Sequence, residues 1–254
     1  MMKTMIAGAV GLSLGFALAT APTFAPAAQA AELKILAGGS MTGPMKELGP
    51  RFEKATGHKL TFVYAGTPEL IRQAASAPFD AGFVPVQVVE SAQARDKFGP
   101  SVNVGRVGYG VSVKAGAPKP DISTAEKFKA VMLKAESYTL YPESASGAII
   151  AKTFEKLGIA EQMKPKLKAQ ANPAGIVSAV AKGEAQYGIF VTHVLSAPGL
   201  EPPVPFPAEL DHQLVFVGAI AKGGPNAAAA QAFIDFLRTP EAVAVFKAKG
   251  VTPG

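Results

Sequence analysis

The stretch Leu33-Lys-Ile-Leu-Ala-Gly-Gly-Ser40-Met-Thr-Gly-Pro-Met45 decides the fold of this chain. Residues 33–37 are apolar in the manner of a buried strand, and residues 38–40 form a tight turn into a helix. That helix is expected to end at Gly57, and its apolar face carries Met41, Met45, Leu48 and Phe52. A strand that turns directly into a helix is the building unit of an α/β sheet.

The same unit recurs along the rest of the chain. Further strands are expected at residues 59–64, 81–84, 106–114, 138–141, 167–170, 187–190 and 213–221. Helices are expected after the caps Thr67, Asn172, Asn226 and Thr239, around 87–97, over 148–157, and from a capping box at 123–126 to about residue 135. Pro50 falls inside the first helix and is expected to kink or split it. Strands that alternate with single helices predict α/β sheets, mostly parallel and covered by helices on both faces.

The two long strands suggest that the chain crosses between two lobes. We expect crossovers at residues 108–114 and 214–220. Residues 31–112 and 216–254 would then form lobe I, and residues 113–215 would form lobe II. Because the chain leaves lobe I and returns to it, that lobe would contain both ends of the mature protein.

The first 30 residues have the pattern of a secretory signal peptide. Lys3 precedes an apolar stretch from Met5 to Leu18, and small residues lead to Ala28-Gln-Ala30. A membrane anchor is the weaker interpretation, because the apolar run is shorter than the roughly 20 residues that span a bilayer. We therefore predict cleavage after Ala30 and a mature periplasmic protein without a membrane span.

Composition excludes several classes of function. The 254 residues include no Cys, so disulfides, thiolate metal sites and cysteine nucleophiles are absent. Without Lys3, 24 Lys+Arg against 19 Asp+Glu leave a net charge of +5, spread without basic runs. This charge favours small anions and gives no nucleic-acid footprint. The three histidines lack metal-ligand spacing, and no nucleotide-binding loop or nucleophile elbow is present, so we expect no metal and no cofactor.

Four strand-to-helix turns could form an anion site. In open α/β sheets, ligands lie beyond the carboxyl ends of the strands, where helix N-termini present free N–H groups. The turns are residues 38–40, 65–67, 144–147 and 172–175, which hold Ser40, Thr67, Ser146 and Asn172. The alternative is that these four residues are ordinary helix caps. Asp80 and His193 could also reach the cleft, although a structural role is open for both.

Several motifs resemble bacterial periplasmic solute-binding proteins of the molybdate-binding type. They include residues 35–45, Phe52-Glu-Lys-Ala-Thr-Gly57, Ala77-Pro-Phe-Asp80, Gly147-Ala-Ile-Ile-Ala-Lys152 and Ala232-Phe-Ile-Asp-Phe-Leu237. The resemblance covers nearly all of residues 32–250. It implies a type II periplasmic binding fold of two α/β lobes joined by two crossover strands. It also implies a monomer that closes on a small anionic ligand and delivers it to the permease of an ABC transporter.

The resemblance places the ligand site in the cleft. In the molybdate binders, hydroxyls and backbone N–H groups hold the oxyanion, and their positions match Ser40, Thr67 and Ser146. We extend this set to Gly39, Ser144 and Thr192, with Tyr141, His193 and Asp80 as further candidates. Two donors of the family pattern are missing, because one falls on Pro173, which has no N–H, and a tyrosine falls on Val191. Thr192 or Tyr141 could substitute for that tyrosine.

A second ligand class stays open for this reason. Residues 141–147, 172–173 and 183–186 look closer to a sister branch that includes a periplasmic aconitate isomerase. The leading interpretation is a non-enzymatic binding protein for a molybdate- or tungstate-type oxyanion, and the alternative is a binder or isomerase of a small polycarboxylate. An isomerase needs a base, for which Asp80, Glu143 and His193 are the candidates. An oxyanion requires a small neutral cavity, whereas a polycarboxylate requires a larger one with Arg, Lys or His inside.

Overall fold

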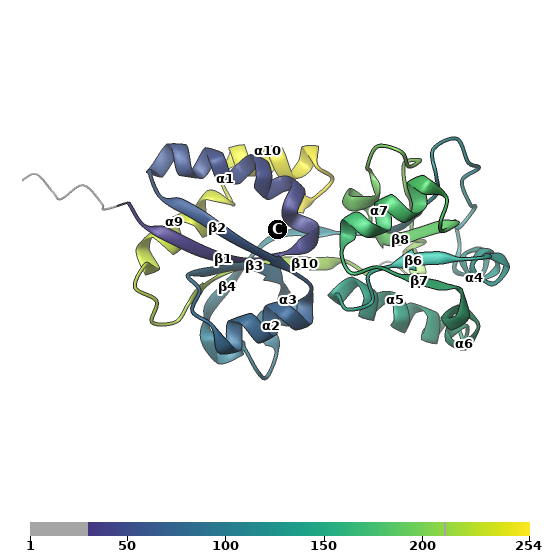
Figure 1. The fold of residues 1–254 in the computed structure, drawn as a ribbon, viewed down its shortest axis with the longest axis horizontal. Helices are drawn as coiled ribbons and strands as arrows, with labels where there is room; N and C mark the ends of the chain where they lie inside the picture. The colour runs from purple at the N-terminus through teal and green to yellow at the C-terminus, as the bar shows by residue number, and fades with distance from the viewer. Residues whose placement is uncertain (1–29, 211) are drawn as a thin grey trace, which may run out of the picture.

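A computed structural model describes residues 30–210 and 212–254, and in it the strands form two separate sheets, one in each lobe (Figure 1). The predicted signal peptide, apart from Ala30, lies outside the described residues. The first sheet has the order β11-β4-β10-β3-β1-β2 and the second has the order β7-β6-β8-β5-β9. The two-lobed α/β fold predicted from the sequence is confirmed.

The bounds of the strands show which part of the chain builds each sheet. The first sheet contains β1 (Glu32–Gly38), β2 (Lys59–Ala65), β3 (Ala81–Pro85), β4 (Phe98–Val107), β10 (Leu214–Ala221) and β11 (Thr252–Pro253). The second sheet contains β5 (Tyr109–Ser112), β6 (Tyr138–Leu140), β7 (Leu167–Ala169), β8 (Tyr187–Val191) and β9 (Val204–Pro205).

Helices cover both faces of the first sheet (Figure 1). On one face lie α1 (Thr42–Thr56), α9 (Ala227–Phe236) and α10 (Pro240–Ala248), and on the other lie α2 (Thr67–Ser76) and α3 (Val86–Glu90). The predicted apolar face of α1 is buried, with Met41, Met45, Leu48 and Phe52 at most 1% exposed. Side chains of β1 point alternately to the two faces of the sheet. Leu33 and Ile35 pack in the hydrophobic core beneath α1, and Leu36 packs in the core beneath α2.

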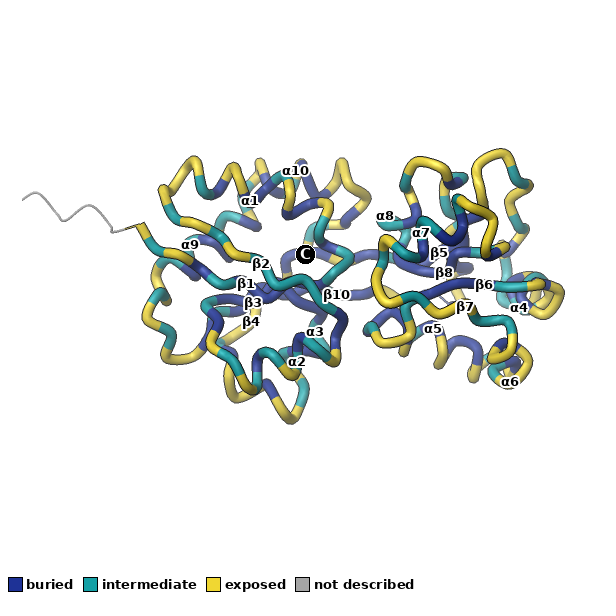
Figure 2. The backbone as a smooth tube through the Cα atoms, in the orientation of Figure 1, coloured by how far each residue is buried: buried dark blue, intermediate teal, exposed yellow. Residues whose placement is uncertain are grey.

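The second sheet is also flanked by helices, and the buried core follows the strands of both lobes (Figure 2). The helices of this lobe are α4 (Ala125–Lys134), α5 (Ala145–Lys156), α6 (Ala160–Met163), α7 (Pro173–Lys182) and α8 (Thr192–Leu195). Short 3-10 turns complete the chain: η1 (Gly39–Met41), η2 (Arg95–Lys97), η3 (Lys164–Lys166) and η4 (Ala208–Leu210).

Each sheet is mixed, whereas we expected mostly parallel sheets. Parallel pairing joins β1 to β2 and β3, and β6 to β7 and β8. The strands next to the lobe crossings pair antiparallel, as β10 does with β3 and β4, and β5 with β8 and β9. A strand that returns from the other lobe enters its sheet from the opposite end, which accounts for the reversed direction.

Strand pairing shows where the chain passes from one sheet to the other. Pairing passes from the first sheet to the second at Gly108, between β4 and β5, so residues 109–112 pair in the second sheet and not in the first. All of β10 pairs in the first sheet, so the return crossing precedes Leu214. Strand pairing therefore changes sheet at residue 108 and before residue 214, and the division of the chain into lobes at residues 112 and 216 stays a prediction.

Three local predictions need correction. Helix α1 continues through Pro50 from Thr42 to Thr56, without a split. The helix expected around 87–97 is the short α3 followed by a turn and η2, because Ser91 ends it in an extended conformation. The cap of α4 is Thr124, whose hydroxyl accepts a hydrogen bond from the Lys127 N–H, and not Ser123. The predicted end of α1 at Gly57 is confirmed, with φ at 76° in the left-handed region.

Candidate functional site between the lobes

The four predicted strand-to-helix turns come together at one hollow between the lobes. Lobe I contributes Gly39, Ser40 and Thr67, and lobe II contributes Ser144, Ser146 and Pro173. Strands β1, β2, β6 and β7 each end at this hollow, because the carboxyl ends of parallel strands meet at one edge of a sheet. The hollow has a volume of about 20 Å³, which is enough for about one water molecule.

The structure separates helix caps from other hydroxyls in these turns. Ser144 and Asn172 are caps, since their side chains accept hydrogen bonds from the N–H groups of Gly147 (3.0 Å) and Gly175 (2.9 Å). Ser40 and Thr67 make no capping hydrogen bond. Thr67 is the first residue of α2, after the N-cap Gly66, and was expected to be the cap itself.

Thr67 instead joins the two lobes. Its Oγ1 accepts a hydrogen bond from the N–H of Ala145, at the first turn of α5, at 2.9 Å. Ser146, in the same turn, is 1% exposed, and its Oγ lies 3.5 Å from the Tyr109 hydroxyl. The Ala145 N–H is one of the donors that a helix N-terminus would offer to an anion, and here a protein oxygen takes it.

Tyr141 closes the hollow from lobe II. Its hydroxyl packs against the backbone of Gly66 in lobe I, so closely that a Cβ at Gly66 would overlap the hydroxyl oxygen. Burial raises the pKa of Tyr141, and the nearby Glu143 adds to this effect. The side chain is therefore neutral at physiological pH and serves as a hydroxyl at the lobe interface.

A larger cleft of about 850 Å³ extends from this hollow along the lobe boundary. Lobe I lines it with Gly39–Pro44 except Met41, with residues 64–66 and with residues 247–250. Lobe II lines it with Tyr141, residues 171–174, His193, Val194 and Ser196. Two lysines, Lys247 and Lys249, belong to this lining, and no Asp or Glu of the described residues does. The electrostatics of the cleft therefore favour an anion.

His193 forms a second polar link between the lobes. Its Nε2 lies 2.9 Å from the carbonyl oxygen of Ser40, and because a carbonyl only accepts, Nε2 carries the proton. Nδ1 is buried and has no hydrogen-bond partner among the described residues. Burial lowers the pKa of His193 to about 4, against a smaller opposing effect of the Ser40 hydrogen bond. The ring is consequently neutral at physiological pH.

A two-lobed fold with its polar turns facing a shared cleft is the arrangement of proteins that close around a solute. The family of bacterial extracellular solute-binding proteins matches residues 33–252 of this chain. The chain belongs to this family.

Relatives within and around the solute-binding family differ in what they act on. An aconitate isomerase of Pseudomonas sp. is 31% identical over 95% of both chains. The molybdate-binding protein ModA of Escherichia coli (strain K12) is 26% identical, over 96% of this chain and 97% of the relative. The solved periplasmic molybdate-binding protein of Azotobacter vinelandii has a TM-score of 0.71 at 19% identity, over 87% and 98% of the two chains. That likeness supports the fold.

Two of the predicted site residues of this solute-binding protein lie away from the cleft lining. Asp80 precedes β3, at the opposite end of the sheet, and its carboxylate accepts hydrogen bonds from the Lys34 N–H (2.8 Å) and the Asn226 side chain (3.0 Å). Thr192 packs its methyl group against Gly110 of β5 and does not line the cleft or the hollow. Ser40, Gly39, Tyr141 and His193 line the larger cleft, and Thr67, Ser144 and Ser146 line the small hollow.

The sequence analysis did not predict that two lysines line the cleft. Lys247 and Lys249 lie at the end of α10, and basic residues there are expected in any helix that ends in solvent. Tyr64 also lines the cleft, and burial raises its pKa to about 12. The sequence does show two lysines shortly before Gly250, but no local pattern indicates that they lie in the same cleft as Ser40.

Among the described residues, no group of His, Asp and Glu could hold a metal ion. In the same part of the chain, no helix has the length and apolar character needed to cross a membrane.

Proposed function

We propose that this chain is the solute-binding component of an ABC transport system in the periplasm and that its cleft binds a small organic polycarboxylate. The observation that carries the proposal is the composition of the cleft lining. It contains the lysines Lys247 and Lys249, the neutral imidazole of His193 and, within the described residues, no acidic side chain. Such a wall stabilises a ligand that carries several negative charges.

The size of the cleft supports the same ligand class. Its volume of about 850 Å³ lies within the range of roughly 300–1,000 Å³ that is typical of sites for organic ligands. The hydroxyl of Ser40 and the side-chain amide nitrogen of Asn172 lie on its walls and can orient an extended molecule, whereas the hydroxyls of Thr42 and Ser196 donate to the carbonyl oxygens of Gly39 and Thr192. A tetrahedral oxyanion would leave most of this space unfilled.

The small hollow supports a tetrahedral oxyanion less well, although Ser40, Thr67 and Ser146 surround it. Its volume of about 20 Å³ is that of about one water molecule. The Ala145 N–H already donates to Thr67, and Pro173 offers no N–H. A desolvated oxyanion would lack donors that contribute about 1.5–3 kcal/mol each. An oxyanion site here therefore requires the lobes to separate at this point.

The aconitate isomerase relative favours a carboxylate ligand and raises a second candidate, an isomerase of such a carboxylate. An isomerase needs a base near an acidic C–H bond, and of the three candidate bases only His193 lines the cleft. In this arrangement the low pKa of His193 makes it a weak base. These features support binding more than proton transfer.

A ligand screen tests the proposal. Thermal unfolding of the mature protein would be followed with tricarballylate, citrate, cis- and trans-aconitate, molybdate, tungstate and sulfate. A ligand at about 100 times its dissociation constant stabilises the folded protein by about 2.7 kcal/mol, so a tricarboxylate should raise the melting temperature clearly. Stabilisation by molybdate or tungstate and by none of the carboxylates would contradict the proposal.

The isomerase candidate needs a separate measurement. Proton NMR spectra of cis-aconitate incubated with the protein should show an unchanged substrate if the chain only binds it. Appearance of the trans isomer, absent from a heat-inactivated control, would establish the enzyme instead.

Export is tested on the protein itself. Periplasmic material should begin at Ala31 or within a residue or two of it, as the signal-peptide pattern predicts. An intact Met1 on periplasmic protein would contradict the predicted cleavage.

A further inference from the structure

Within the part of the chain that the structure describes, the end of α10 supplies all the positive charge that lines the cleft. Among the described residues, lobe II lines the cleft with neutral groups, including the neutral His193. On lobe I, the lining lysines are Lys247 in the last turn of α10 and Lys249 directly after it. A ligand with several negative charges must therefore turn one of them toward α10.

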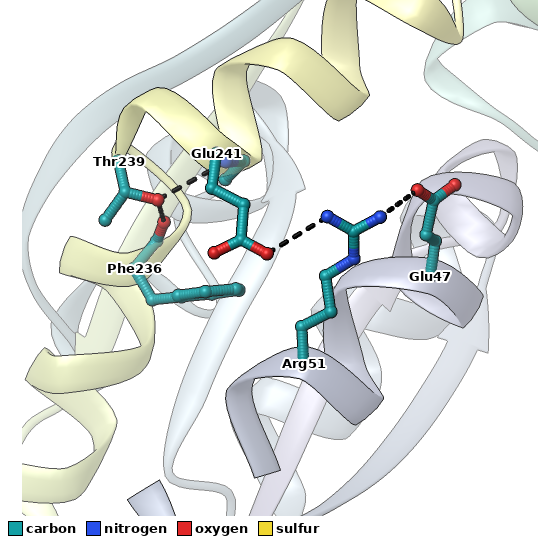
Figure 3. A network of polar contacts seen from close by, with 6 residues as sticks. Glu47, Arg51, Phe236, Thr239 and Glu241 are labelled. Atoms are coloured by element: carbon teal, nitrogen blue, oxygen red, sulfur yellow. Dashed lines mark hydrogen bonds and ion pairs between the residues drawn. The ribbon is translucent and has the colours of Figure 1, made fainter. Parts of the chain in front are cut away.

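A network of ion pairs on lobe I engages the nearby carboxylates (Figure 3). Arg51 of α1 donates to Glu47 at 2.6 Å and to Glu241 of α10 at 3.0 Å. The second oxygen of Glu47 lies 3.3 Å from Nζ of Lys249. Both oxygens of Glu47 are thus occupied, and the charge of Lys249 is partly neutralised.

Lys247 remains without a carboxylate partner. Lys247 is exposed, and its ammonium group makes no ion pair with any of the described residues, whereas Lys249, two residues further along the chain, pairs with Glu47. A competing explanation is that Lys247 merely complements the negative end of the α10 dipole. In that role Lys247 would stabilise the helix, and replacing it would change the affinity for every ligand by the same factor.

We propose that Lys247 is a specificity-determining residue, which binds a carboxylate that a tricarboxylate has and a dicarboxylate lacks. The inference rests on the proposed function, because it assigns one part of that ligand to one side chain. The ion-pair network supports it by holding α10 against α1 and by pairing Glu47 and Glu241 with other cations, so that neither carboxylate competes with a ligand for Lys247.

Calorimetric titration with three related acids tests this assignment. Tricarballylate carries three carboxylates on a propane chain, and glutarate and methylsuccinate each lack one of them. Lys247→Gln should lower the affinity for tricarballylate about tenfold and leave at least one of the dicarboxylates nearly unaffected. Lys247→Arg should keep most of the preference for the tricarboxylate. Lys222→Gln is the matched control, since Lys222 is an exposed lysine of lobe I outside the cleft lining.

The outcomes separate this inference from the proposed function. A wild-type protein that binds neither these three acids nor the other carboxylates of the ligand screen overturns both. A wild-type protein that binds another of those carboxylates but not tricarballylate overturns the role of Lys247 alone. A wild-type protein that binds tricarballylate, with equal affinity in Lys247→Gln, overturns the role of Lys247 and leaves the proposed function standing. A Lys247→Gln variant with a lowered melting temperature but the wild-type ratio of tricarboxylate to dicarboxylate affinity would show that Lys247 only stabilises the helix dipole. That result would also overturn the inference.

Discussion

Thr67 shows that a hydroxyl at the start of a helix can serve the lobe interface and not the helix. Its Oγ1 accepts from the Ala145 N–H across the lobes, whereas Thr239 caps α10 by accepting from the Ala242 N–H at 3.3 Å (Figure 3). The two threonines precede or begin helices of the same lobe and have the same chemistry. They differ in which partner the fold brings within reach.

Thr67→Val should therefore weaken ligand binding with little effect on folding. The substitution keeps the shape of the side chain and removes the acceptor of a hydrogen bond worth about 0.5–1.5 kcal/mol, so affinity should fall about 2- to 12-fold. Thr239→Val should instead cost about 1 kcal/mol of unfolding free energy and leave affinity unchanged. Calorimetry and urea unfolding of both variants would measure this, and a loss of stability without a loss of affinity in Thr67→Val would contradict it.

His193 should make the protein less stable in mild acid. Its pKa is lowered from the ordinary 6.5 to about 4 in the folded protein, mainly by burial. Between these values the unfolded chain binds a proton that the folded protein does not, so the free energy of unfolding decreases as pH falls from about 6.5 to about 4. At about pH 5.5 the loss is about 1.4 kcal/mol relative to neutral pH.

An NMR titration would check the pKa of His193 directly. The signal is assigned by its absence in His193→Gln, a variant whose amide can still donate to the Ser40 carbonyl. Urea unfolding at about pH 5.5 and at about pH 7.5 should show a smaller pH dependence in this variant than in the wild type. A His193 ring that titrates near its ordinary pKa would show that the ring is not buried in solution.

At the scale of secondary structure, α1 contains a proline that the rest of the helix tolerates. Pro50 is exposed, and its missing N–H leaves the carbonyl of Lys46 without its helical donor. The buried face around Leu48 and Phe52 holds the helix together on both sides of this position. Packing against the sheet therefore outweighs the local preference to break.

Pro50→Ala should stabilise the protein. Alanine restores the hydrogen bond and removes a penalty of about 3 kcal/mol, less about 0.4–1 kcal/mol for the freer unfolded chain, so a gain of about 2 kcal/mol is expected. Pro44→Ala is the control. Pro44 lies in the first turn, where an N–H has no helical acceptor, so alanine restores no hydrogen bond there, and because Pro44 is buried no gain in stability is expected. Equal unfolding free energies of Pro50→Ala and wild type by urea titration would contradict the expectation.

For the whole molecule, Gly66 is a point of close contact between the lobes. The backbone of Gly66 is extended, with φ at −75° and ψ at 167°, which alanine adopts without strain. A Cβ there would overlap the Tyr141 hydroxyl and lie 2.6 Å from the Glu143 carbonyl oxygen, and both groups belong to lobe II. The closest obstacles to a side chain at this position thus come from the other lobe.

Gly66→Ala should consequently impair closure and spare the folding of each lobe. The overlap costs about 1–3 kcal/mol in the closed form, so ligand affinity should fall at least about fivefold while the melting temperature without ligand stays near that of the wild type. Small-angle X-ray scattering with saturating tricarballylate should show a larger radius of gyration than for the wild type. Gly224→Ala, at a glycine with ordinary contacts in lobe I, is the control. Wild-type compaction in Gly66→Ala would refute the closure role.

The sequence by itself determined the two-lobed α/β fold, most of its strands and the edge at which their turns meet. Apolar segments along the chain predicted strands, the spacing of Met41 and Phe52 predicted the buried face of α1, and Gly57 predicted where that helix ends. These features could be predicted because burial patterns and glycine conformations are local properties. They also located the turns with Ser40 and Thr67, since parallel strands bring their carboxyl ends to one edge.

Only the tertiary structure decided what these turns contact. The partner of Thr67 is Ala145, 78 residues away, and His193 reaches Ser40 across 153 residues. Lys247 joins the same cleft because α10 packs along α1 (Figure 1). The direction of β10 and the position of the crossing at Gly108 likewise follow from how the chain returns between lobes. Periodicity carries no information on such contacts, because they depend on how segments far apart in the chain pack together.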